Sequence, residues 1–70
     1  MIGLFHRSVQ NKEKLMIFYI DSTNHITQRI IRVLDVNEKQ VLAFCYWRKQ
    51  VRTFKLDKIL SADVLRKRKA

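Results

Sequence analysis

Four runs of β-branched and aromatic residues, separated by short polar segments, restrict what this chain can fold into. Such runs are typical of β-strands, and Asp21–His25, Asp35–Lys39 and Arg48–Gln50 are typical of turns. Strands in this order predict an antiparallel meander, and a sheet with so few residues to cover it should curl into a small barrel. The four runs are Leu15–Ile20, Ile26–Val36, Val41–Trp47 and Val51–Asp57.

The two ends of the chain have different patterns. Ile2, Phe5 and Val9 recur at helical spacing, which predicts a short helix over Gly3–Gln10 that plugs one end of the barrel. Ile59–Leu65 is interpreted as a last short strand. We therefore expect a single, mainly β domain over residues 1–70, with a helix or arm at 1–12, a barrel of about five strands at 13–65 and a basic tail at 66–70.

Catalytic and metal sites are not expected. Cys45 is the only cysteine and lies within an apolar run, which predicts a buried, inert thiol in a reducing compartment. His6 and His25 show no metal-ligand spacing, so no metal or other cofactor is expected. No phosphate-binding loop, paired acid motif or nucleophile motif stands out, so we do not expect an enzyme.

The location of the protein is predicted from its apolar runs. The longest of them, Leu15–Ile20 and Val41–Trp47, are too short to span a bilayer. The N-terminal residues do not follow the layout of a secretion signal. We therefore expect a cytoplasmic protein that does not bind membranes.

The charge of the chain is its strongest compositional signal. Fifteen lysine and arginine residues against six aspartate and glutamate residues give a formal net charge of +9. Such an excess points to a polyanionic partner, with nucleic acid first, an acidic protein second and an anionic membrane surface third. The alternative is that the charge serves only solubility.

From residue 13 to 65, the order of residue types resembles the WYL domain, a module of bacterial transcription regulators. The shared pattern is a strand that ends in tyrosine, a polar turn, an arginine before a β-branched residue, an apolar strand with an Ala-aromatic pair, and an Arg-x-Phe-x-Leu-Asp-basic-Ile segment. These segments are Ile17–Tyr19, Asp21–His25, Arg29–Ile31, Leu42–Cys45 with Arg48, and Arg52–Ile59.

Some family features are changed in this chain. The tripeptide that names the family falls on Lys39–Val41, a family glycine is replaced by Asn24, and a family proline by Val33. We expect no helix-turn-helix module before the barrel, because the dozen or so residues ahead of it are too few for three helices. The resemblance implies a divergent WYL-like domain with an Sm-like barrel, which senses a ligand, often nucleic acid, and adjusts the activity of a partner.

Three arginines are the main candidates for a ligand site. Arg29, Arg48 and Arg52 occupy the positions of the family's basic patch, and Arg52 also alternates with apolar residues on its strand. A charged group on an apolar face needs a carboxylate, a phosphate or a place at the rim. The alternative is an internal ion pair, for example of Arg52 with Asp57 or Asp21. By counting, at least nine basic side chains have no acidic partner available.

Aromatic residues and the tail supply further candidates. Tyr19 and Trp47 are predicted to support the arginines by stacking on a ligand, whereas Phe44 is predicted to lie in the core. Tyr46 and Trp47, as neighbours in a strand, should face opposite ways. Arg66–Lys69 is interpreted as a solvated tail, with a phosphate-binding tail as the alternative.

Two functional hypotheses follow. The first is a regulatory module, linked to transcription, that binds nucleic acid or a phosphate-bearing ligand through a groove of Arg29, Arg48 and Arg52 with Tyr19 and Trp47. The second is a protein-interaction module that docks on an acidic regulator or self-associates through a sheet edge. The two hypotheses differ in salt dependence. Neutralising phosphates makes the affinity for nucleic acid fall steeply as the salt concentration rises.

Overall fold

A computed structural model describes residues 2–65 of the chain. It contains one N-terminal helix and five antiparallel strands in a single sheet, which confirms the predicted fold class. The basic run Arg66–Lys69 lies outside the described residues. The elements are α1 (Ile2–Asn11), β1 (Lys14–Ile20), β2 (Ile26–Val36), β3 (Gln40–Cys45), β4 (Gln50–Lys55), the 3-10 turn η1 (Leu56–Lys58) and β5 (Ile59–Val64).

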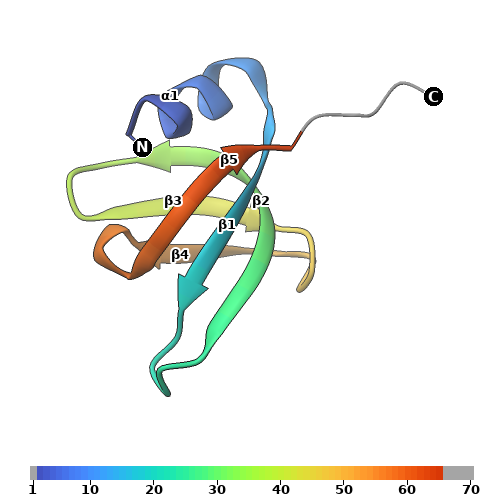
Figure 1. Cartoon of the computed structure of the whole chain (residues 1–70). Coiled ribbons are helices and arrows are strands. Elements are labelled where there is room, and N and C mark those ends of the chain that lie inside the picture. Colours follow the sequence, from blue (N-terminus) through green and yellow to red (C-terminus); the bar gives the residue numbers. More distant parts are fainter. Residues whose placement is uncertain (1, 66–70) are drawn as a thin grey trace.

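The sheet curls on itself so that its two ends face each other. Its strand order is β4-β3-β2-β1-β5, which makes β4 and β5 the edges. In Figure 1, β5 and β1 cross in front of β3 and β4, and α1 lies at one end of the sheet. No helix within residues 2–65 is long and apolar enough to cross a membrane.

Alternation along the strands separates an inner face from an outer face. Cross-strand partners such as Ile31 and Cys45 point to the same side, so the register assigns each residue to one face. The predicted burial of Cys45 is confirmed, since its side chain is inaccessible in the core. The buried apolar residues are Phe5, Leu15, Ile17, Ile31, Val33, Val41, Ala43, Cys45, Phe54 and Ile59.

The helix α1 closes one end of the core. It packs mainly against β2, and Phe5 is completely buried there. Ser8 lies beside Phe5 on the inward side of the helix, and its hydroxyl donates to the carbonyl of Glu13 at 2.6 Å. The backbone N–H of Val33 in turn donates to Ser8 Oγ at 3.1 Å. The predicted plug is therefore attached to β2 by hydrogen bonding as well as by apolar packing.

Replacing Ser8 by alanine is expected to destabilise the domain by about 1–3 kcal/mol, because the buried N–H of Val33 would lose its acceptor. Urea denaturation of the wild type and the variant measures the difference. The matched control is Gln10→Ala, an exposed position of α1, which should change stability by less than about 0.5 kcal/mol. Equal losses in the two variants would contradict the structural role of Ser8.

The turn between β1 and β2 is stabilised by hydrogen bonds to a side chain and contains a residue with positive φ. Asn24 has φ +65°, a conformation that asparagine tolerates better than most residues. The carboxylate of Asp21 accepts the hydroxyl and the N–H of Thr23 and the N–H of His25. These bonds, the Thr23 hydroxyl first, lower the pKa of Asp21 below its ordinary value. The turn between β1 and β2 is thus held without a glycine.

Three local expectations are wrong. The run Val41–Trp47 does not form one strand, because β3 ends at Cys45, and Tyr46 and Trp47 lie in the turn to β4. Phe44 is not in the core, because it pairs with Arg32 and Val51 on the outer face and is only half-buried. Residues after Lys55 leave the strand for the 3-10 turn, so Leu56 and Asp57 do not continue the alternation of β4.

Candidate functional site

Two arginines lie on the inner face of the sheet. In the register, Arg29 is opposite Ile17 and Arg52 is opposite Ala43, and both of these partners belong to the core. Both arginines therefore point to the inner side, as the alternation predicted for Arg52. Arg29 lies near the start of β2, whereas α1 is attached at Val33, further along the same strand.

Arg29 is a nearly buried cation, with 8% of its surface exposed. Its Nε donates to Thr27 Oγ1 at 3.2 Å, and its Nη1 lies 4.0 Å from the sulfur of Cys45. The Thr27 hydroxyl is itself oriented by the carbonyl of Tyr19, to which it donates at 3.2 Å. Within residues 2–65, the ion pair that forms is Arg7–Glu13, and no carboxylate lies within 4.0 Å of Arg29. The guanidinium is therefore held by neutral groups alone.

Trp47 covers the guanidinium of Arg29 from the solvent side. The Arg29 Cζ lies 5.0 Å from the centroid of the Trp47 ring, and the Arg48 Cζ lies 4.7 Å from it. Despite these two cation–π contacts, 63% of Trp47 remains exposed. The turn that presents it contains Lys49 with φ +54°. This arrangement places an accessible aromatic ring between two arginines.

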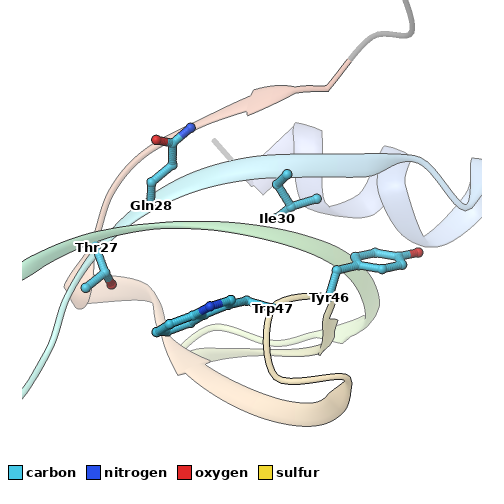
Figure 2. Close-up of a pocket in the computed structure, with 5 residues that line it drawn as sticks. All are labelled: Thr27, Gln28, Ile30, Tyr46 and Trp47. Atoms are coloured by element: carbon cyan, nitrogen blue, oxygen red, sulfur yellow. The ribbon is translucent and has the colours of Figure 1, made fainter.

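A shallow groove of about 580 Å³ runs between this turn and β2. Figure 2 shows Trp47 and Tyr46 reaching from the turn alongside the strand that carries Thr27, Gln28 and Ile30. The groove exists because β3 pairs with β2 only as far as Cys45 and Ile31. One further bond, from the N–H of Tyr46 to the carbonyl of Ile30, closes that ladder at 3.1 Å. The first residues of β2 thus border the groove instead of another strand.

The structure brings together three of the five predicted site residues. Arg29, Arg48 and Trp47 form one cluster, whereas Arg52 is exposed on the inner face and, within residues 2–65, makes no cation–π contact with the ring. Neither Asp57 nor Asp21 pairs with Arg52 within the described residues. Tyr19 does not border the groove, because it packs edge-on against Phe54 with ring centroids 5.1 Å apart. Sequence reasoning missed Thr27, Gln28 and Ile30, which have no signal beyond their place early in β2.

The fold is known from a solved structure. It is similar to proteasome accessory factor B/C (PafBC) of Arthrobacter aurescens, with a TM-score of 0.77 and 19% sequence identity. The match covers 90% of this chain but only 11% of that chain. No family model matches the sequence, and no curated protein matches it. The chain therefore has the fold of a small part of PafBC, and its resemblance to the WYL domain stays a prediction.

Proposed function

We propose that this domain is a regulatory binding module that takes single-stranded nucleic acid, or a nucleotide of the same chemistry, in the groove beside Trp47. The observation that carries the proposal is a nearly buried arginine, Arg29, which has no carboxylate partner within residues 2–65 and lies under an exposed aromatic ring. The WYL resemblance, with its implied ligand sensing in transcription regulation, agrees with this function. A cytoplasmic location is part of the same proposal.

The desolvation of Arg29 is the physical basis of the proposed function. Removing a charge from water without an opposite charge nearby is costly, and the neutral partners Thr27 and Cys45 recover only part of that cost. A phosphate at the groove would supply the missing charge, and guanidinium groups bind phosphate in bidentate geometry. Arg48, which is exposed on the same ring, would add a second cation for the ligand.

The ring of Trp47 would bind the base of the ligand by stacking. Aromatic platforms beside cationic side chains are the usual means of holding unstacked bases, and they work with any base because every base has a flat face. Apolar Ile30 and polar Gln28 and Thr27 line the opposite side of the groove. The site therefore suits a flat base with an attached phosphate better than it suits duplex backbone alone.

Trp47→Ala is expected to weaken binding of a labelled single-stranded oligonucleotide by about 1–3 kcal/mol, the contribution of one base stacked on an aromatic ring. Fluorescence anisotropy at low salt measures this loss. Because Trp47 is the only tryptophan of the chain, its own emission should also change when the wild type binds. Unchanged affinity of the variant, or an absence of binding by the wild type at low salt, would contradict the proposed function.

A second candidate function is docking on an acidic protein, or self-association, through a sheet edge. Its support is the edge strand β4, on which Val51 is half-exposed on the outer face and lies opposite Phe44 of β3. Self-association through this edge would be mainly apolar and would persist in salt, whereas binding of phosphates falls steeply with salt. The salt dependence of the affinity therefore separates self-association from nucleic-acid binding.

A further inference from the structure

A second cationic and aromatic cluster lies on the outer face of the sheet, next to the groove. Lys14 and Arg32 are directly opposite each other on β1 and β2, and Arg32 is opposite Phe44 on β3. The Lys14 Nζ lies 4.7 Å from the centroid of the Tyr46 ring. Phe44 and Tyr46 meet edge to face, with centroids 5.0 Å apart. Four side chains from β1, β2, β3 and the following turn thus share one patch, which we call the outer cluster.

The outer cluster has an unfavourable arrangement of charge. Like charges directly opposite each other on neighbouring strands are destabilising. The carboxylates of Asp35 and Asp63 lie on this face, but each accepts the N–H of the next residue, and neither forms an ion pair with Lys14 or Arg32 in the described part of the chain. The Nε of Arg32 is also buried and has no hydrogen-bond partner within residues 2–65. An anion bound between Lys14 and Arg32 would offset the repulsion between these two cations.

Tyr46 joins the outer cluster to the groove. Its ring lines the groove beside Trp47 and also lies under Lys14 of the outer cluster. The groove and the outer cluster are therefore neighbours on a continuous surface, with Ile30 on β2 in between. A ligand longer than a mononucleotide that lies in the groove would have its next residues directed over Tyr46 towards the two cations.

We infer that Lys14 and Arg32, beside Tyr46 and Phe44, form a second phosphate site that extends the groove into a track for several nucleotides of a single strand. The inference rests on the proposed function and deepens it, because it selects a polymeric ligand over a free nucleotide. The occupant is a phosphodiester backbone, with Tyr46 available to stack on a base as Trp47 does. Two aromatic rings along a cationic track suit a single strand, whose bases are free to stack.

The test compares the double variant Lys14→Gln/Arg32→Gln with the charge-matched control Lys39→Gln/Lys55→Gln. The control removes two exposed lysines near the turn between β2 and β3, away from the groove. Binding of an oligothymidine dodecamer is titrated at several salt concentrations. The double variant should bind at least tenfold more weakly than the control, and its log–log salt slope should fall by about 0.7 for each lost phosphate contact.

Several outcomes would overturn the inference. If the double variant and the control bind alike while Trp47→Ala binds weakly, the outer cluster is not a phosphate site, and the groove alone binds the ligand. If the wild type does not bind the dodecamer at low salt, the proposed function fails and the inference fails with it. If polyglutamate of matched charge binds as tightly as the dodecamer and is equally sensitive to the double variant, the site recognises charge alone and not a nucleic acid strand.

Folding of the variants is checked independently. Lys14 is exposed, so the single variant Lys14→Gln cannot disturb the core. Its melting temperature should equal that of the wild type or exceed it, because the repulsion with Arg32 is removed. The single variant should still bind the dodecamer more weakly than Lys39→Gln does. Equal binding by these two folded single variants would overturn the role of Lys14.

Discussion

Arg29→Met is expected to weaken binding of a single-stranded oligonucleotide at least tenfold while the folded domain becomes more stable. A hydrogen bond to a charged group contributes about 1.5–3 kcal/mol, and methionine cannot make one to a phosphate. The same change removes a nearly buried cation that has no carboxylate partner in the described residues. Replacing a poorly compensated buried charge by an apolar side chain of similar size is neutral or stabilising.

Anisotropy titrations and thermal melts of Arg29→Met are therefore measured side by side. The log–log salt slope should fall by about 0.7 if one phosphate contact is lost. Lys39→Met is the control, because it removes one exposed charge from the turn between β2 and β3. A lower melting temperature with unchanged binding would instead assign Arg29 a structural role, through its contacts with Thr27 and Cys45.

Phe5→Ala should have the largest effect on stability. The ring of Phe5 is completely buried between α1 and the sheet, and truncating a buried phenylalanine costs about 3–5 kcal/mol. Domains of this size have a free energy of unfolding of roughly 0.05–0.15 kcal/mol per residue, so this loss is a large part of the total stability. Each kcal/mol lost lowers the melting temperature by about 4–8 °C, and the variant should therefore melt at least about 12 °C below the wild type.

Circular dichroism melts measure the effect of Phe5→Ala, with Val9→Ala on the same helix as the control. Val9 is 37% exposed, and alanine favours the helix more than valine does, so its truncation should destabilise the domain by less than about 1 kcal/mol. The groove lies at the start of β2, whereas α1 is attached further along that strand at Val33, so Phe5→Ala should keep its affinity at temperatures where it is folded. Small and equal shifts in both variants would show that α1 does not close the core.

Much of the fold was predictable from local patterns. The alternation and the polar turns predicted all four strands of the meander, and the spacing of Ile2, Phe5 and Val9 predicted α1. The end of β3 was not predictable, because Tyr46 and Trp47 are residue types that favour strands. Only the pairing of β3 with its neighbours decides that the ladder ends at Cys45 and that these two rings belong to a turn.

Local patterns in the sequence were enough to predict the strands, the inward orientation of Arg52, the excess of positive charge and the burial of Cys45. The tertiary structure alone decided which arginine is buried. Arg52 lies on the edge strand β4 and stays exposed, whereas Arg29 lies on β2 beyond its pairing with β3 and is enclosed by Cys45 and by the ring of Trp47. The contacts of Trp47 with Arg29 and of Tyr46 with Lys14 likewise join residues far apart in the chain, and these depend on register and turn geometry that no local pattern encodes.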